Sequence, residues 1–260
     1  MTEAARRRMD LLRRRFVEAM TAWNWSRKTI LSYEQNVRYF MDWLGRETEI
    51  TDLAQVTAET MTCYQTSLLG EEKRNGERIS VGTQHTRICG PKAFLGYLWR
   101  EGKLLINPAG SLVYPKMRRR LPQANLTPKE ANQLIDAADR TTPLGMRDRA
   151  ILEVLYATGV RNAELRALTL ADIGERTLTV HAGKGGRDRM VPLGAIGWSA
   201  LSDYVQEARP KLGAHDGVHN IFLTKNGLAL DAMAVINAVR RAARRAGLKK
   251  HLHPHLLRHA

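Results

Sequence analysis

The sequence predicts a mainly α-helical fold with a small antiparallel β-sheet, in which a helical domain is followed by a mixed α/β domain. Apolar residues recur at helical spacing through the first half, and two short alternating stretches occur together only in the second half. A basic, proline-containing segment separates the halves, and 260 residues suffice for two cores. We therefore expect a helical domain over residues 1–113, a linker over 114–125 and an α/β domain over 126–260.

The charge balance predicts a polyanionic partner. The formal net charge is +15 and the isoelectric point is near 10.3. Residues 1–115 hold 17 basic and 13 acidic side chains, whereas residues 116–260 hold 24 and 13. The second half should therefore make most of the contacts to a phosphate backbone. Many Trp, Leu and Ile residues at helical spacing argue against a ribosomal or histone-like protein.

Neither the cysteines nor the N-terminus indicate secretion. Cys63 and Cys89 lie in apolar helical patterns and form neither a disulfide framework nor a metal site, so we expect both to pack in the core. No apolar region follows the arginine-rich N-terminus, and no run approaches the roughly 20 residues of a membrane span. We expect a cytoplasmic protein without membrane association, metal or cofactor.

Four helices are expected in the first domain. Two cover residues from about 10 to 46, and Ser26 is the N-cap of the second. Thr57 should cap a third helix, and a fourth starts near Val81, where Pro91 either kinks it or splits it. A basic face, whose alternative role is an ordinary solvated surface, would comprise Arg27, Lys28, Arg38, Thr83, His85 and Arg87.

The linker contains three successive arginines, Arg118, Arg119 and Arg120, which cannot share a core. A stiff basic linker between two basic domains suits a C-shaped clamp that closes around a DNA duplex. The alternative is an ordinary solvated hinge.

In the second domain, Thr127 is a predicted N-cap. Alternating residues over 177–181 and 189–193 predict a hairpin with Lys184 at its tip. Helices are expected over 198–208 and about 231–246. The last of these should display on one side the arginines Arg240, Arg241, Arg244 and Arg245, suited to a DNA groove or to phosphates.

A turn between two helices carries Arg161. The preceding helix, from about residue 147, ends at Gly159, and the next begins at Asn162. A guanidinium in a buried turn needs partners because it stays charged. Taken alone, Arg161 is better explained as a surface residue that caps a helix.

Two further basic motifs contain Lys184, His255 and Arg258. Phosphoryl transfer without a metal needs guanidiniums to hold the phosphate oxygens, a cationic acid beside the leaving oxygen, and an imidazole to share the nucleophile's proton. The i,i+3 spacing of His255 and Arg258 puts both on one helical face. Together with Arg161, these residues supply the required types.

The order and spacing of these motifs resemble the tyrosine recombinase (phage integrase) family, in particular its short two-domain Xer-like members. The matching segments are 157–165, Lys184 with 189–193, and 253–260. The resemblance implies a helical core-binding domain and a tyrosine-recombinase catalytic domain, acting as a homotetramer on a double-stranded recombination site without ATP or metal.

The resemblance also implies roles for individual residues. Arg161 and Arg258 would clamp the scissile phosphate, Lys184 would protonate the leaving oxygen, and His255 would assist the nucleophile. Glu164 would orient the site, although plain helix packing explains it equally well.

The family's nucleophilic tyrosine follows the second-arginine motif, but all seven tyrosines here precede Arg258. We therefore expect a catalytic domain incomplete at its C-terminus, a weakened tetramer, and a chain that binds DNA without forming a phosphotyrosine. One alternative is a recombinase-derived DNA-binding protein that blocks an active partner. Another is a type IB topoisomerase relative, which would relax DNA without site preference.

Overall fold

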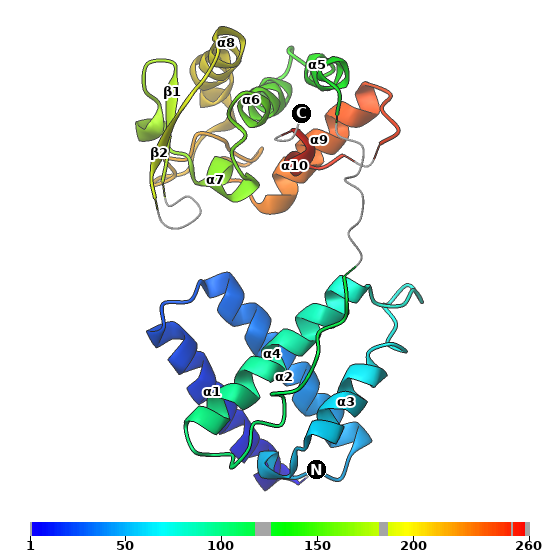
Figure 1. Cartoon of the computed structure of the whole chain (residues 1–260). Helices are drawn as coiled ribbons and strands as arrows, with labels where there is room; N and C mark the ends of the chain where they lie inside the picture. Colours follow the sequence, from blue (N-terminus) through cyan, green and yellow to red (C-terminus); the bar gives the residue numbers. More distant parts are fainter. Residues whose placement is uncertain (1, 118–125, 182–186, 251, 258–260) are drawn as a thin grey trace. The chain divides into compact units, whose positions relative to one another are not determined.

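The computed structural model describes residues 2–117, 126–181, 187–250 and 252–257, apart from the side chain of residue 255. The chain divides into two compact units, Met1–Arg119 and Arg120–Ala260, each with its own hydrophobic core (Figure 1). Most of the predicted linker, including Arg118, Arg119 and Arg120, lies outside the described residues.

The first unit is helical, as predicted. It contains α1 (Glu3–Ala22), α2 (Arg27–Glu47), a short 3-10 helix η1 (Leu53–Gln55), α3 (Ala58–Ser67) and α4 (Val81–Arg100). The predicted N-caps are confirmed, because the Ser26 and Thr57 hydroxyls accept hydrogen bonds from backbone N–H groups of α2 and α3. The predicted start near residue 10 is wrong: Thr2 caps α1 at Glu3, and its exposed arginines favour the helical state.

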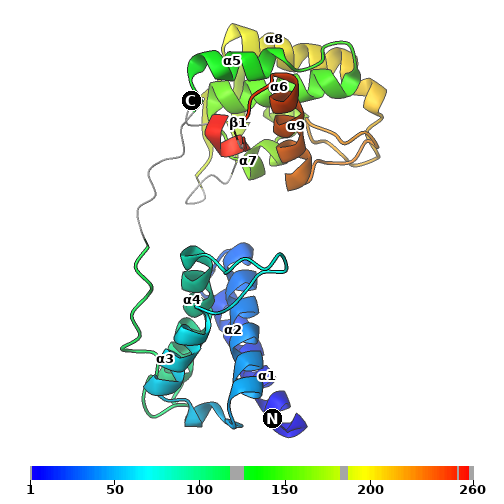
Figure 2. The same cartoon turned by 90° about the vertical axis from the view of Figure 1, so that its right-hand side faces the viewer.

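Helices α2 and α4 lie side by side in close contact (Figure 2). A Cβ atom on Gly90 would lie 2.8 Å from both the Asn36 Cβ and the Tyr33 carbonyl oxygen, so only glycine permits this approach. Pro91 is buried next to it, within a continuous helix, so the predicted alternative of a split helix is wrong. Packing against α2 offsets the backbone hydrogen bond that Pro91 cannot donate.

The predicted burial of Cys63 is wrong, because its side chain is exposed, whereas Cys89 is half-buried. Helix α3 turns Met61 and Tyr64 toward the core, which leaves Cys63 on the solvent side.

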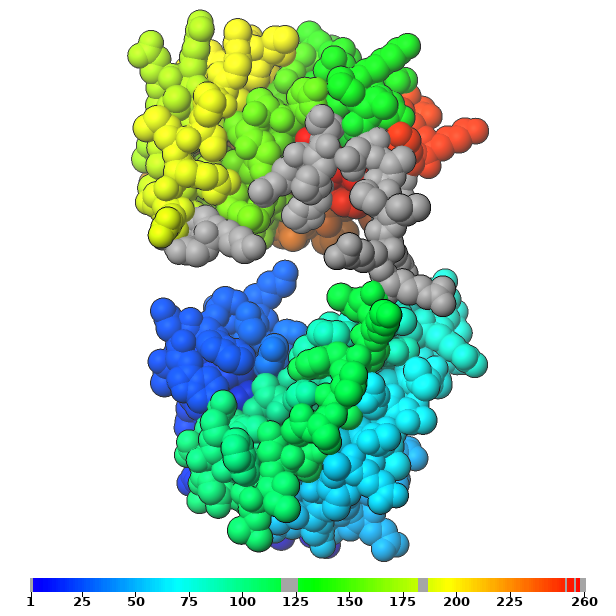
Figure 3. Space-filling model, viewed as in Figure 1, coloured from blue at the N-terminus to red at the C-terminus, as the bar shows by residue number. Residues whose placement is uncertain are grey.

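The segment after α4 returns across the surface of the first unit (green in Figure 3). The Lys92 Nζ donates to the Leu112 carbonyl oxygen at 2.5 Å, and the Gln65 side chain donates to the Val113 carbonyl at 3.0 Å. These bonds hold the segment along α4 and α3.

The second unit combines helices with one small sheet. Its helices are α5 (Pro128–Asp136), α6 (Pro143–Thr158), α7 (Asn162–Ala167), α8 (Ala195–Asp203), α9 (Ala232–Arg245) and α10 (Pro254–Leu257). Shorter helical turns are η2 (Leu170–Asp172), η3 (Tyr204–Ala208, of π type) and η4 (Pro210–Leu212). The strands are β1 (Thr177–Val180) and β2 (Arg189–Pro192).

The predicted hairpin and the Thr127 cap are confirmed. Strands β1 and β2 are antiparallel, and Val180 pairs with Arg189 at the end nearest the connecting segment. Helix α6 is packed against α5, α8, α9 and α10, with Ile151, Leu152 and Leu155 fully buried. The core of this unit is therefore built around the helix that ends at the arginine turn.

Candidate active site

The arginine turn has the predicted architecture. Helix α6 ends at Gly159, which adopts φ +59°, and α7 starts at Asn162. Val160 is buried between them, so the chain is anchored on one side of Arg161. About a third of the Arg161 side chain (34%) is exposed. This arginine is therefore held in a fixed turn while part of its guanidinium faces solvent.

Glu164 holds Arg161 in place. One carboxylate oxygen accepts a hydrogen bond from the Arg161 backbone N–H at 2.9 Å, and the other accepts from Nη1 at 2.7 Å. The Arg161 guanidinium makes no other hydrogen bond among the described residues. Because a guanidinium has five N–H donors, Arg161 retains donors for a bound anion.

A second arginine, to which the sequence reasoning gave no role, meets the same carboxylate. Arg189 on β2 donates to Glu164 through Nη1 at 3.2 Å and Nη2 at 2.6 Å. Its side chain is also about one-third exposed (34%). Only the packing of β2 against the α6–α7 turn creates this pair, so no local sequence pattern predicts it.

Glu164 stays ionised in this setting. Burial disfavours its charged form, but hydrogen bonds from Arg189 and Arg161 outweigh the burial and lower its pKa to about 2. The same interaction raises the pKa of Arg189. The carboxylate therefore orients two permanently cationic groups that come from different elements.

The other predicted catalytic groups are outside the described part of the structure. Lys184, Arg258 and the His255 side chain are not described, so the meeting of all four groups stays a prediction. Their described neighbours are nevertheless placed. Arg189 ties the loop end of the hairpin to the Arg161 turn, and α10, whose backbone includes His255, packs against α6 and α9.

The predicted basic face of the first unit consists of two kinds of residue. Arg27, Lys28 and Arg38 are exposed on α2, although Arg38 donates to Glu34 at 3.0 Å. On α4, by contrast, Thr83 is half-buried and the His85 ring stacks on Tyr114 at a centroid distance of 4.5 Å.

Arg87 is occupied by protein partners. Its Nη1 donates to both carboxylate oxygens of Glu71, at 2.5 and 2.7 Å, and its guanidinium lies 4.0 Å from the Tyr39 ring centre. Arg87 would have to exchange these contacts to reach a phosphate.

The arginines of α9 also differ in their partners. Arg241 donates to the buried Asp148 at 2.6 and 2.9 Å, and Asp148 also pairs with Arg147. Arg240 and Arg244 are exposed and have no ion pair among the described residues. These two are the cations on this helix that are open to an external anion.

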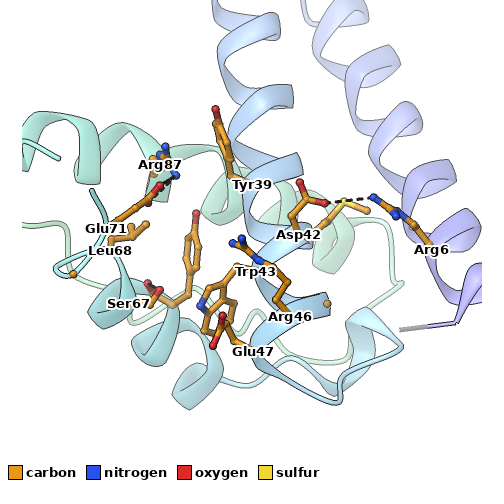
Figure 4. Close-up of a pocket in the computed structure, with 14 residues that line it drawn as sticks. Arg6, Tyr39, Asp42, Trp43, Arg46, Glu47, Ser67, Leu68, Glu71 and Arg87 are labelled. Carbon is orange, nitrogen blue, oxygen red and sulfur yellow. Dashed lines mark hydrogen bonds and ion pairs between the residues drawn. The ribbon is translucent and has the colours of Figure 1, made fainter. Parts of the chain in front are cut away.

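A cavity of about 890 Å³ opens in the first unit (Figure 4). Its charged lining residues are largely paired with each other, as in Arg6 with Asp42 and Arg87 with Glu71. The Trp43 Nε1 and Tyr64 Oη atoms on its wall are buried without a hydrogen-bond partner among the described residues. The cavity holds neither arginine of the Glu164 network, so it is a separate feature.

Among the described residues, no group of three or more His, Cys, Asp and Glu side chains could hold a metal ion. Within the same ranges, no helix has both the length and the apolar character needed to cross a membrane.

Comparison with known proteins defines the class. Residues 124–260 match the phage integrase family. The tyrosine recombinase XerC 2 of Ralstonia nicotianae is 36% identical over 245 residues, covering 94% of this chain and 70% of the relative. XerC of Oceanobacillus iheyensis is 35% identical, covering 91% of this chain and 76% of the relative. XerD of Listeria monocytogenes is 30% identical, covering 90% and 77%.

Solved structures show the same fold at lower sequence identity. A λ integrase dimer bound to a COC′ core site gives a TM-score of 0.70 at 18% identity, covering 96% of this chain and 83% of that one. The Tn1549 transposon integrase in complex with circular intermediate DNA gives 0.70 at 19%, covering 96% and 84%. The second unit thus has the fold of a tyrosine recombinase catalytic domain. The chain belongs to the phage integrase family, and its relatives include Xer tyrosine recombinases.

Proposed function

We propose that this chain binds a double-stranded DNA recombination site and belongs to the machinery of site-specific strand exchange. The observation that carries this proposal is the Arg161–Glu164–Arg189 network, in which a buried, ionised carboxylate fixes two partly exposed guanidiniums. The family match and the net charge of +15 support DNA as the polyanion.

Each catalytic residue has a separate role in cleavage of the DNA strand. Arg161 and Arg258 hold the non-bridging oxygens of the scissile phosphate and stabilise its pentacovalent transition state. Lys184 gives a proton to the departing 5′ oxygen, and His255 takes or shares the proton of the attacking hydroxyl. Glu164 keeps Arg161 oriented.

A tyrosine hydroxyl attacks phosphorus in this reaction, giving a 3′-phosphotyrosine and a free 5′ hydroxyl. The ester keeps the bond energy, so rejoining to a second strand needs no ATP. Two of the seven tyrosines, Tyr156 and Tyr204, lie in the second unit, and neither is placed to act as that nucleophile. Tyr204 is buried and accepts a hydrogen bond from the Leu223 N–H at 3.2 Å, and burial raises its pKa to about 12. Tyr156, on α6, packs against the core.

We therefore propose that a polypeptide of these 260 residues binds its site but does not cleave it. This property also fits the alternative role of a DNA-binding protein that occupies sites or blocks an active partner. A tetramer on DNA is part of the proposal, supported by the λ integrase tetramer bound to a Holliday junction, a structure that gives a TM-score of 0.69 at 18% identity.

Selection from a random duplex library tests the site-specific part. A recombinase-type protein should enrich an inverted repeat bound by two copies, and Arg161→Ala should weaken binding to it more than Lys211→Ala, which removes an exposed cation elsewhere in the same unit. Enrichment of no sequence would contradict the proposal and favour a topoisomerase-like activity without site preference.

A nicked suicide substrate tests the absence of cleavage. After incubation with the selected duplex, a denaturing gel should show no covalent protein–DNA adduct. An adduct that survives denaturation would show that one of the seven tyrosines is a nucleophile.

A further inference from the structure

A histidine at the loop end of the hairpin bridges two carboxylates. His181 directly follows β1, and its Nδ1 lies 2.7 Å from the Asp188 Oδ2 while its Nε2 lies 2.9 Å from the Asp172 Oδ1. Asp188 directly precedes β2, and Asp172 ends the short helix η2. One imidazole thus joins both strands of the hairpin to a third segment.

This geometry identifies the protonation state of the ring. A carboxylate only accepts hydrogen bonds, and a neutral imidazole donates only one. The other oxygen of Asp172 accepts from the Thr169 backbone N–H at 2.7 Å and from its hydroxyl at 2.9 Å, as expected of an ionised acceptor. Both contacts can be hydrogen bonds only when His181 is an imidazolium.

The contacts of His181 with Asp172 and Asp188, called the His181 bridge below, lie directly beyond the last residue pair of the two strands. Val180 and Arg189 form the last strand pair, so His181 and Asp188 are the first residues beyond it. Asp172 is part of a well-anchored region, since its side chain is only 9% exposed and Thr169 pairs with Asn220. The bridge therefore fixes both residues from which the connecting segment departs.

The two ends of this segment are also next to the arginine network. Arg189, which follows Asp188, donates to Glu164 and is thereby joined to Arg161. Lys184 lies between His181 and Asp188 in the sequence. His181 and Asp188, the residues on either side of the lysine-bearing segment, therefore have fixed positions relative to Arg161 and Arg189.

We propose that His181 is a positioning residue for Lys184: as an imidazolium it holds both ends of the lysine-bearing segment in register with the Arg161–Glu164–Arg189 network. This inference rests on the proposed function, because it assigns Lys184 a contact with the DNA phosphate. When His181 loses its proton, one of its two hydrogen bonds is lost, and the two ends of the lysine-bearing segment are less restrained.

The direction of the pH dependence follows from the same contacts. Hydrogen bonds to Asp188 and Asp172 raise the pKa of His181 above its ordinary value. Burial raises the pKa of Asp172, but hydrogen bonds from Thr169 and then from His181 outweigh the burial and lower it. These two aspartates are the ionisable groups that face the ring in the described structure; Glu164 and Arg189 pair with each other instead. The bridge therefore needs a protonated His181 and two ionised aspartates: it is lost as pH rises through the raised His181 pKa, and it is also lost in acid where the aspartates gain protons.

The first measurement needs no DNA. NMR titration of the histidines in the full chain, assigned with His181→Gln, should show that His181 titrates above the ordinary histidine range. Asp188→Asn should lower that pKa, and amide exchange at Val180 and Arg189 should accelerate as His181 loses its proton. The proposal would be overturned if His181 had an ordinary histidine pKa and Asp188→Asn left that pKa unchanged.

The second measurement links the bridge to DNA. At constant ionic strength, the affinity of the wild-type chain for its selected duplex should fall between pH 6 and pH 8.5 by about threefold more than that of His181→Gln. His215→Gln, which changes an exposed histidine of the same unit, should behave like wild type. Equal pH profiles for wild type and His181→Gln would refute the positioning role.

Lys184→Ala separates this inference from the proposed function. If His181 acts through Lys184, this variant loses the extra pH dependence while its His181 pKa and hairpin exchange stay as in wild type. If the extra pH dependence survives in Lys184→Ala, the His181 charge acts on DNA directly and the positioning role is wrong. If Lys184→Ala binds as tightly as wild type while the NMR results hold, the assignment of Lys184 in the proposed function fails instead.

Discussion

Replacing Glu164 with glutamine removes the charge on which the arginine network depends and keeps the size of the side chain. Glu164 accepts one hydrogen bond from the Arg161 backbone and three from the guanidiniums of Arg161 and Arg189. A glutamine presents an NH₂ group to one of these cationic donors, so at least one of the charged hydrogen bonds is replaced by a repulsive contact.

The size of the effect follows from the pKa of Glu164. A shift from 4.5 to about 2 corresponds to about 3 kcal/mol of stabilisation of the ionised form. The carboxylate is only 8% exposed, but both arginine side chains are 34% exposed, so solvent screening reduces this figure. We expect Glu164→Gln to lower the unfolding free energy of the second unit at pH 7 by about 2 kcal/mol.

The pH dependence provides the decisive assay. The folded-state pKa of Glu164 is depressed, so its stabilisation is complete above about pH 4.5 and is lost as pH falls toward 2. Urea unfolding followed through the backbone amides of α6 should show a gap between wild type and Glu164→Gln that shrinks over this range. Glu175→Gln, an exposed glutamate of the same unit, should match wild type throughout. A variant as stable as wild type at pH 7, or a gap of constant size down to pH 2, would refute the reasoning.

Five further substitutions test other parts of the structure. Asp148→Asn leaves two paired arginines without their buried carboxylate and should lower the unfolding free energy of the second unit by about 3 kcal/mol, measurable by urea unfolding. Gly90→Ala gains about 1 kcal/mol of helix propensity but forces a Cβ to within 2.8 Å of backbone, so thermal unfolding should show a net loss of about 1–2 kcal/mol in the first unit. Arg240→Ala and Arg244→Ala should each reduce the slope of log affinity against log salt for duplex DNA by about 1, whereas Arg241→Ala should mainly lower stability.

Local signals in the sequence predict most of the fold. Each of the N-caps at Ser26, Thr57 and Thr127 combines a short polar side chain with a following apolar periodicity, and all three are present. The hairpin was predictable from strict alternation, and the end of α6 from Gly159. These features depend on a few neighbouring residues, which is why no tertiary information is needed.

The errors arose where packing overrides a local rule. Pro91 normally interrupts a helix, but close packing of α4 on α2 keeps the helix continuous. The core position predicted for Cys63 was wrong because an apolar pattern does not show which side of a short helix faces inward. Arg87 was predicted to lie on a basic face or on a solvated surface; Glu71 and Tyr39 contact its guanidinium, and its role in DNA binding stays a prediction. Contacts between residues that are far apart in the sequence produce no local sequence pattern from which they could be predicted.

The arginine network shows why part of the site was beyond sequence reasoning. Glu164 was predicted either to orient the site or to serve only in helix packing, and its i,i+3 spacing from Arg161 could be seen in the sequence. Its pairing with Arg189, however, requires the hairpin register in which Val180 opposes Arg189. Along β2, Arg189 is half-buried and the next residue, Met190, is 68% exposed. A slip of one residue in that strand would turn Arg189 to solvent and put Met190 against the carboxylate. The register of the hairpin therefore determines whether Glu164 pairs with both Arg161 and Arg189, and the pairing of Arg189 with Glu164 in turn stabilises that register.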